Sequence, residues 1–476
     1  MLAQPAQGAA QARALRARPL SRARSLAGRN RAGGRAGELR ATVVARGGSD
    51  PRSAVLEFAP CRPAPRGLGK RADIWYHVGA ANQTPGKSGF AHLFEHMMFS
   101  GSRHVQPSPF QVLESIGASG MNGTTNFDRT NYFEVVPSNQ LAAALWVESD
   151  RMGYLLDTLD EQKLRTQRDV VSNEKRQRYE NQPYGLAGLR VCDLLFPKPH
   201  SYYECVIGDI ADIQAASAAD VRQFFRTWYG PQNASLAIVG DFDPKVAREL
   251  VEKYFGPIPG GPAVKRPDIP QANIGRMIKE TVEDKLAELP RLILVWKGVR
   301  LYTDEEPAGD VLADVLGSGR TSRLYKALVF ERQLASGVSA GNGSYGLGGW
   351  FQVTVTAARG HTIDEIRPVV DQIVVELQQQ APTKEEVERA QRNIIANQVR
   401  TVERIGGFGG KADLLNHYQT YLGDPGYLAR DLARYRAVTP AAAQAYANKF
   451  LIPNERIELD VVPAAKRTAS AEGAER

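Results

Sequence analysis

Two of the seven histidines in this 476-residue chain stand four residues apart in the segment GFAHLFEHMMFSGS, residues 89–102. On a helix, His92 and His96 would project from the same face, and Glu95, three residues after His92, would lie on that face too. Two neutral imidazoles and a carboxylate are a donor set that suits zinc, with a fourth position left open for water. A helix whose histidines merely pack in the core is the alternative, but the spacing favours a zinc site.

The third protein ligand has to come from elsewhere in the chain. The remaining histidines stand in no pattern: His77, His104, His200, His361 and His417. Glu174 is the best carboxylate, because it follows the apolar pair Val170 and Val171 on an expected helix and so can face inward. The alternative is an exposed glutamate in a charged helix, which is the interpretation that suits Glu161 and Glu180. The pattern alone does not decide between the two for Glu174.

The elements around the motif are typical of an α+β domain that begins near Ala72. ADIWYHVGAA indicates a strand, TPGKSG a turn, and NGTTNFDRTNYFEVV a hairpin punctuated by Asn122 and Gly123. SNQLAAALWVESDRMGYLL is expected to be a helix capped by Ser138, and residues 160–180 another helix that ends at QPYG.

An internal repeat indicates that this domain is duplicated. The series SAADVRQFFRTWYG, PQN and ASLAIVG recurs about 222 residues later as TPAAAQAYANKFL, IPN and ERIELDVV. The Pro/Gly-rich stretch GPIPGGPAVKRPDIP lies between the two copies and is the natural linker. The predicted organisation is a leader at 1–71, a first domain at 72–255, a linker at 256–275, a second domain at 276–465 and a tail at 466–476.

Charge and composition exclude several classes of protein. The net charge of +8 is carried entirely by residues 1–50, which hold ten arginines, Glu38 and Asp50. The remainder of the chain is neutral, so it offers no excess charge for binding nucleic acid. No run approaches 18 apolar residues, so we expect no membrane span. Cys61, Cys192 and Cys205 form neither a disulfide framework nor a CxxC site, and we expect isolated thiols.

The Arg/Ala-rich leader leaves three interpretations open. Its composition suits an organellar transit peptide, a disordered segment, or a start in the wrong reading frame. We favour a disordered or mis-started leader over a transit peptide. The sequence does not fix the compartment; a periplasmic or extracytoplasmic location is favoured, with the mitochondrion as the alternative.

HLFEH is the inverted zincin signature, and the chain resembles the insulinase/pitrilysin family of zinc metallopeptidases from Ala72 to Val462. Three segments carry the resemblance in order and spacing: WYHVGA…GKSGFAHLFEHMMF, NGTTNFDRTNYFE and VVSNEKRQ. The 78 residues from His96 to Glu174 are the family's spacing. The resemblance implies one zinc per chain bound by His92, His96 and Glu174, with Glu95 as the general base.

The resemblance also implies a fold and a substrate site. The fold is a duplicated α+β metallohydrolase domain, half of a four-domain clamshell, in which the second copy lacks metal ligands. A substrate would lie as an added strand along the edge that contains Asn122, Gly123 and Thr124, held by main-chain hydrogen bonds. A plain hairpin turn at this place is compatible with that role.

Three departures from the family pattern bear on function. Members that work alone carry an Arg and a Tyr seven residues apart in the second domain, where this chain has Val329 and Ser336. An accessory glutamate before the third ligand is replaced by Gln167, and no NGL-type turn precedes WYHVGA. A zinc-bearing half without the Arg/Tyr pair resembles the catalytic subunit of a homo- or heterodimer whose partner supplies the pair.

The sequence therefore predicts a zinc metalloendopeptidase that hydrolyses peptides or unfolded protein segments. The alternative is a non-catalytic subunit that holds peptides within a processing-peptidase-like complex.

Overall fold

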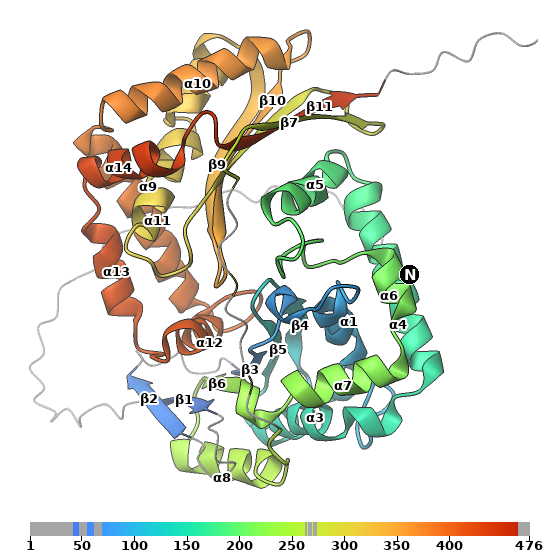
Figure 1. Cartoon of the computed structure of the whole chain (residues 1–476). Coiled ribbons are helices and arrows are strands. Elements are labelled where there is room, and N and C mark those ends of the chain that lie inside the picture. The colour runs from blue at the N-terminus through green and yellow to red at the C-terminus, as the bar shows by residue number, and fades with distance from the viewer. Residues whose placement is uncertain are drawn as a thin grey trace, which may run out of the picture. The chain divides into compact units, whose positions relative to one another are not determined.

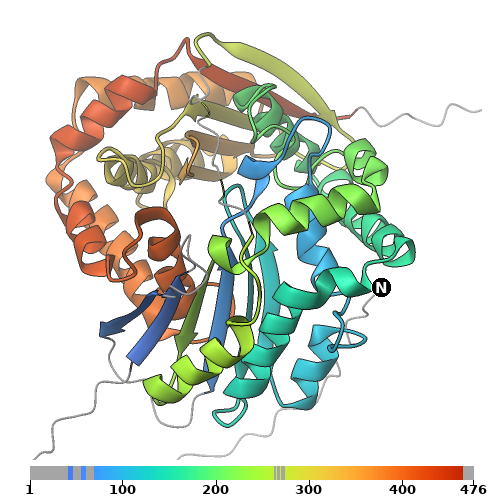
Figure 2. The ribbon, with the colours of Figure 1, turned by 60° about the horizontal axis from the view of Figure 1, so that its bottom comes forward.

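The first of two sheets carries the elements around the HLFEH motif. The computed structural model describes residues 41–46, 55–60, 69–261, 264, 269 and 274–464. The first sheet has six strands in the order β2-β1-β6-β3-β5-β4, and all its pairs are antiparallel. Its strands are β1 (Ala41–Arg46), β2 (Val55–Pro60), β3 (Lys70–Tyr76), β4 (Ser119–Thr125), β5 (Thr130–Val136) and β6 (Ala234–Val239). Figure 2 shows these strands side by side.

The second sheet has five strands in the order β7-β11-β8-β10-β9. They are β7 (Ile278–Asp284), β8 (Arg291–Lys297), β9 (Ala335–Ser344), β10 (Gly349–Ala357) and β11 (Arg456–Pro463). Only the β7–β11 pair is parallel. The repeat found in the sequence ends in β6 and in β11, which hold equivalent interior positions in their sheets. The predicted α+β class is therefore confirmed.

Helices cover both faces of each sheet. Those of the N-terminal half are α1 (Phe90–Met97), α2 (Pro109–Ser115), α3 (Leu141–Tyr154), α4 (Glu161–Lys175), α5 (Gly185–Leu195), α6 (Ile210–Ala215), α7 (Ala218–Trp228) and α8 (Pro244–Phe255). Those of the C-terminal half are α9 (Glu306–Gly317), α10 (Ile363–Gln379), α11 (Lys384–Glu403), α12 (Lys411–Leu422), α13 (Leu428–Arg436) and α14 (Pro440–Phe450). Short 3₁₀ and π-helical turns are η1 (Ala80–Asn82), η2 (Leu155–Thr158), η3 (Arg176–Glu180), η4 (Pro231–Asn233) and η5 (Tyr325–Glu331). None of the helices in the described residues is both long and apolar enough to cross a membrane.

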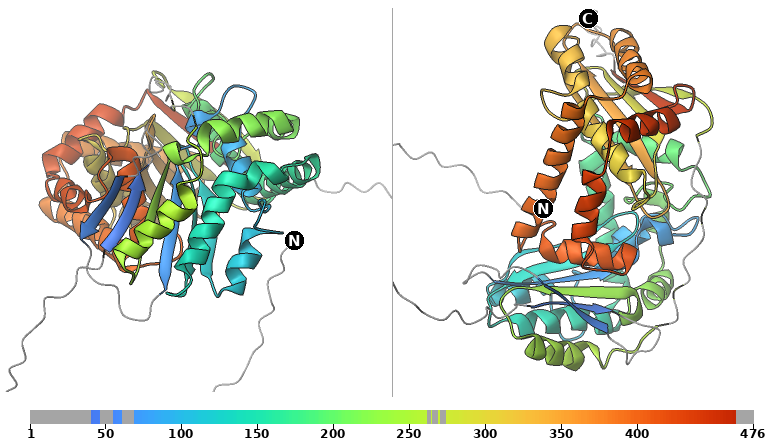
Figure 3. Two further views of the ribbon diagram at one scale, coloured as in Figure 1. Left: turned by 90° about the horizontal axis from the view of Figure 1, so that it is seen from below. Right: turned by 90° about the vertical axis from the view of Figure 1, so that its left-hand side faces the viewer.

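The two halves exchange helices. One face of the first sheet packs on its own helices, whereas α12 from the C-terminal half covers β3 and β6 on the other face. Reciprocally, α5 from the N-terminal half packs on β11 of the second sheet. Figure 1 and Figure 3 show both arrangements. This exchange joins the described residues from Ala41 onward into one compact unit. The boundaries between the first domain, the linker and the second domain remain predictions.

Local structure differs from the sequence-based expectation near the motif. Asn122 and Gly123 lie inside strand β4, and the turn of the hairpin is made by residues 126–129 instead. There the side chain of Asn126 accepts hydrogen bonds from the backbone N–H groups of Asp128 and Arg129, a turn chemistry typical of asparagine. The helix predicted from Ser138 begins at Leu141, without a side-chain cap.

Strands β1 and β2 correct the prediction that residues 1–71 are entirely a leader. The two strands pair with each other, and Val43 of β1 is opposite Ile238 of β6. Each strand is only six residues long, too short to stand out in the sequence from the Arg/Ala-rich composition of the leader. The rest of this range up to 68, and the predicted tail at 466–476, lie outside the described residues.

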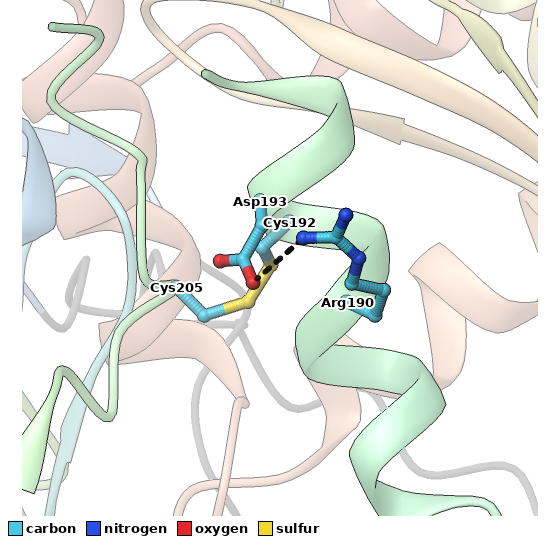
Figure 4. The surroundings of a disulfide bond; sticks show 4 residues. All are labelled: Arg190, Cys192, Asp193 and Cys205. Carbon is cyan, nitrogen blue, oxygen red and sulfur yellow. Dashed lines mark ion pairs between the residues drawn. A yellow bond between two sulfur atoms is a disulfide. The ribbon is translucent and has the colours of Figure 1, made fainter. Parts of the chain in front are cut away.

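A disulfide bond corrects the prediction of isolated thiols. Cys192 on α5 is bonded to Cys205 in the loop before α6, with their Cα atoms 5.5 Å apart (Figure 4). Arg190 and Asp193 flank the bond and form an ion pair of 3.7 Å. No sequence pattern predicts this bond, because the 13-residue separation fits no common cysteine pattern. Cys61 lies outside the described residues.

We predict that the Cys192–Cys205 bond contributes about 3 kcal/mol to the free energy of unfolding, the value expected for closing a loop of this length in the unfolded chain. Urea unfolding of a Cys192→Ser/Cys205→Ser double variant, compared with the oxidised wild-type chain, measures that loss. The same measurement with a thiol reductant is the control, since the two proteins should then be equally stable. Two free thiols at Cys192 and Cys205 in the oxidised protein would contradict the assignment.

Candidate metal centre and catalytic groups

Helix α1 is held in place by its apolar face. Leu93, Phe94 and Met97 are at most 1% exposed and pack in the core of the N-terminal half. Gly89, the residue before the helix, has a φ of +77°, and a Cβ there would lie 2.8 Å from the carbonyl oxygen of Ile207. Only glycine suits that backbone and that close approach. The opposite face of the helix is thereby left to carry the polar side chains.

His92 and His96 meet Glu174 of α4 at one point. The Nε2 atoms of the two imidazoles are 3.3 Å apart. Oε2 of Glu174 lies 3.0 Å from Nε2 of His96 and 3.6 Å from Nε2 of His92. Tetrahedral zinc with ligands at about 2.05 Å requires donor atoms separated by about 3.3 Å. The donor triangle therefore fits zinc closely, and it is the only such group of three among the described residues.

The protonation states of these groups suit a divalent cation. Burial, and then the charge of neighbouring His96, lowers the pKa of His92 to about 4. Burial alone would raise the pKa of Glu174, but the hydrogen bond with His96, together with the nearby imidazole and Arg178 charges, lowers this pKa to about 2. At neutral pH the site thus offers a neutral imidazole and an ionised carboxylate, the forms in which these groups bind metal.

Glu174 is oriented by its surroundings at the end of α4. Arg178 holds its other oxygen, with Nη1 2.9 Å from Oε1, so Oε2 is directed at the imidazoles. The helix changes to the π-helical turn η3 at Arg176, a distortion that is frequent at functional sites. Of the apolar pair that the sequence pointed to, Val171 is fully buried, whereas Val170 is 41% exposed. Of this pair, only Val171 therefore packs in the core on the helix that carries Glu174.

Glu95 lies beside the donor triangle and is not part of it. Its Oε2 accepts a hydrogen bond of 2.7 Å from Oγ1 of Thr125, the last residue of β4. Burial raises the pKa of Glu95, although the hydrogen bond from Thr125 acts in the opposite direction. This carboxylate is thus placed to exchange a proton next to the triangle. Thr125 and Arg178 were not predicted as site residues; Thr125 stands in the quoted NGTT segment, but nothing in the sequence distinguishes it from Thr124.

The residues predicted to bind substrate lie on β4, which is an edge strand. Gly123 pairs with Tyr132, and a Cβ at Gly123 would lie 2.9 Å from the ring of Phe99. The side chain of Asn122 accepts a hydrogen bond from the N–H of Gly123, and Thr124 donates to Asn131. An edge strand of this kind presents backbone groups to an added strand.

The departures from the family pattern lie outside this group. Val329 is partly buried in η5 and packs on the core of the C-terminal half. The hydroxyl of Ser336, at the start of β9, donates to the carbonyl oxygen of Ala357 at 3.1 Å. Gln167 lies within α4, about two turns before the predicted ligand Glu174. Neither Val329 nor Ser336 carries the guanidinium or phenol that the resemblance leads us to expect at these positions in members that work alone.

Comparisons with known proteins identify the family. Residues 71–189 match the family model described as Insulinase (Peptidase family M16), and residues 215–394 match the model described as Peptidase M16 inactive domain. The zinc protease PqqE of Helicobacter pylori is 30% identical over 271 residues, which are 56% of this chain and 59% of that protein. The match therefore spans little more than half of either protein.

Solved structures share the fold. A protease from Helicobacter pylori has a TM-score of 0.77 at 24% identity, covering 84% of this chain and 95% of the other. The periplasmic protease PqqL from Escherichia coli has a TM-score of 0.71 at 17% identity, covering 89% of this chain and 47% of the other. The donor triangle of His92, His96 and Glu174 lies within residues 71–189, the range of the insulinase model. This chain is a member of the insulinase family of peptidases, family M16.

Proposed function

We propose that this chain is a zinc-dependent metalloendopeptidase and the catalytic subunit of a dimer. The observation that carries the proposal is the donor triangle of His92, His96 and Glu174, whose spacings match those required by tetrahedral zinc. Glu95 lies beside that triangle with its carboxylate already held by Thr125. The names of zinc protease relatives are consistent with this chemistry.

The roles of the residues follow from their positions. Zinc bound by the triangle would polarise the peptide carbonyl and acidify a water molecule. Glu95 accepts the proton of that attacking water at its carboxylate and passes it to the leaving amine. Burial raises the pKa of Glu95, which strengthens it as a base. Arg178 keeps Glu174 directed at the imidazoles.

Peptides or unfolded segments are the substrate class that suits the edge strand. An extended peptide can add to β4 at Asn122, Gly123 and Thr124 through main-chain hydrogen bonds, which read little of its sequence. A folded protein offers few segments that are free to do this.

A second subunit completes the site. Val329 and Ser336 stand where family members that work alone carry the Arg/Tyr pair, so the partner supplies that pair. The aligned PqqL chain is about twice as long as the part that this chain matches, which supports a working unit of two such halves. A peptide-holding subunit without turnover is the second candidate, and the missing pair is the observation that favours it.

An oxidising compartment suits the chain. Disulfides persist outside the cytosol, and Cys192 is bonded to Cys205. The similar PqqL protein is described as periplasmic. We therefore assign this chain an extracytoplasmic location as part of the same proposal.

Zinc content tests the ligand assignment. The chain is expected to bind one zinc, and Glu174→Gln to lower the affinity at least tenfold, because a neutral amide is a poor ligand. Elemental analysis after dialysis against a graded chelator measures this. Glu180→Gln, an exposed glutamate on the following turn, is the matched control and should retain zinc. Stoichiometric zinc in the Glu174→Gln protein would remove Glu174 from the ligand set.

Glu95→Gln separates turnover from metal binding. The amide keeps the shape of the side chain but cannot accept the water's proton, so we expect retained zinc and a loss of activity of about 10²–10⁴-fold. Hydrolysis of a labelled unfolded protein, such as casein, by zinc-loaded chains provides the rate. Equal rates for the variant and the wild type would exclude Glu95 as the base. A wild-type chain with zinc and its partner but no turnover would leave the peptide-holding alternative.

The partner prediction concerns rate rather than metal. Orientation of the substrate carbonyl lowers a barrier by several kcal/mol, at most about 7–11 kcal/mol, so the zinc-saturated chain alone should cleave slowly. Proteins that co-purify with a tagged copy should raise the rate, and Val329→Arg/Ser336→Tyr should raise it in part without them. Full activity of the purified monomer would refute the requirement for a partner while leaving the zinc site in place.

A further inference from the structure

Among the described residues, Thr125 is the one whose side chain is hydrogen-bonded to the carboxylate of Glu95. The Oγ1 to Oε2 distance is 2.7 Å. Among the described residues, no other hydrogen bond reaches this carboxylate, so Oε1 is left for the reacting groups. A distance of 2.7 Å is typical of a well-formed O–H···O hydrogen bond, which makes this contact an effective tether.

The proton of Thr125 is directed at Glu95 and not elsewhere. Thr125 Oγ1 is also 3.2 Å from Oγ1 of Thr130, and either hydroxyl could donate in that contact. Thr130 is fully buried and gives its own proton to the carbonyl oxygen of Val78 at 2.9 Å. The contact with Glu95 is both shorter and made to a carboxylate, so the Thr125 hydroxyl donates to Glu95.

This contact joins the base to the edge strand. Thr125 is the last residue of β4 and pairs with Thr130 of β5, so its backbone is fixed within the sheet. Asn122, Gly123 and Thr124, where a peptide strand would add, precede it on the same strand. The Glu95 carboxylate is thereby fixed relative to the strand that would receive the peptide, although Glu95 itself belongs to α1.

We propose that Thr125 is a positioning residue for peptide hydrolysis, whose hydroxyl fixes the Glu95 carboxylate relative to edge strand β4. The inference rests on the proposed function. Among the described residues, the Thr125 hydroxyl contacts Glu95 and Thr130 and none of the metal ligands. We therefore expect its removal to leave zinc and peptide binding intact and to slow turnover. The loss should resemble that of other residues that orient active-site groups, about 10–100-fold.

Three variants isolate the hydroxyl. Thr125→Val keeps the shape of the side chain and removes the donor, and Thr125→Ser restores the donor. Thr158→Val is the matched control, because Thr158 is a half-buried threonine of the same half whose hydroxyl donates to the carbonyl oxygens of Gly101 and Leu155. All measurements use the full chain.

The first measurement needs no activity. In the metal-free chain, Thr125→Val is expected to lower the midpoint of thermal unfolding, because it leaves the half-buried Glu95 carboxylate without its donor. In a Glu95→Leu background the same substitution should have a much smaller effect, since the interaction is already absent. Equal shifts in the two backgrounds would overturn the assignment.

The second measurement is turnover of labelled casein by the zinc-loaded chain with its co-purifying proteins. Thr125→Val is expected to lower kcat about 10–100-fold with an unchanged KM and one zinc retained, and Thr125→Ser to recover most of kcat. Wild-type kcat in Thr125→Val, or a loss explained by missing zinc, overturns the inference. Failure of the proposed function looks different, because wild-type and Glu95→Gln chains would then cleave equally, whatever the unfolding midpoints show.

Discussion

The packing of α1 against α4 is the constraint on which the site depends. Two histidines on one helix provide two donors, and a third donor has to be brought from 78 residues away in the sequence. The apolar faces of both helices do this, because Leu93 and Phe94 of α1 and Leu164 and Val171 of α4 are fully buried. Each such side chain contributes about 1.5–3 kcal/mol when it is buried. That is ample to hold an ionised Glu174 against two imidazoles before any metal binds.

A second constraint fixes the edge strand beside the helix. Asp128, in the turn between β4 and β5, accepts a hydrogen bond of 2.9 Å from the phenol of Tyr421 and one of 2.8 Å from the backbone N–H of Gly346. The phenol of Tyr202 donates to the same carboxylate. Tyr421 and Gly346 belong to the C-terminal half. The tip of the hairpin that carries Thr125 is therefore hydrogen-bonded to residues that are more than 200 positions away in the sequence.

Arg71, near the start of β3, also joins the first sheet to the C-terminal half. Its guanidinium is fully buried beside Asp73, at 2.7 Å, and donates to the carbonyl oxygens of Ile405, Gly407 and Gly409. A buried charge costs several kcal/mol unless it is paired and hydrogen-bonded, and here both conditions are met. The loop before α12 is thus attached to the first sheet, which explains how α12 can serve as a layer of the opposite half.

The sequence predicted those features that depend on local spacing. His92, Glu95 and His96 are set by one turn of helix, and the repeat that ends in β6 and β11 is carried by similar short segments. The sequence alone could not decide whether Glu174 is a metal ligand or an exposed glutamate, because its orientation depends on contacts between helices. The disulfide, strand β1 and the hydrogen bond from Thr125 to Glu95 depend on the tertiary fold alone. Asn122–Gly123 was assigned to the turn because that dipeptide favours one in isolation, whereas pairing with β5 extends the strand through it.

The C-terminal half supports the first sheet through contacts that do not require metal ligands. Its helix α12 covers one face of the first sheet, and Tyr421 and Gly346 form hydrogen bonds with the β4–β5 turn. Its own sheet packs against α5 of the N-terminal half. These contacts fix the position of β4, and β4 fixes Glu95 through Thr125. Under the proposed function, a second copy without metal ligands can therefore still be required for hydrolysis, because the proposed base Glu95 is positioned through a strand that the second copy contacts.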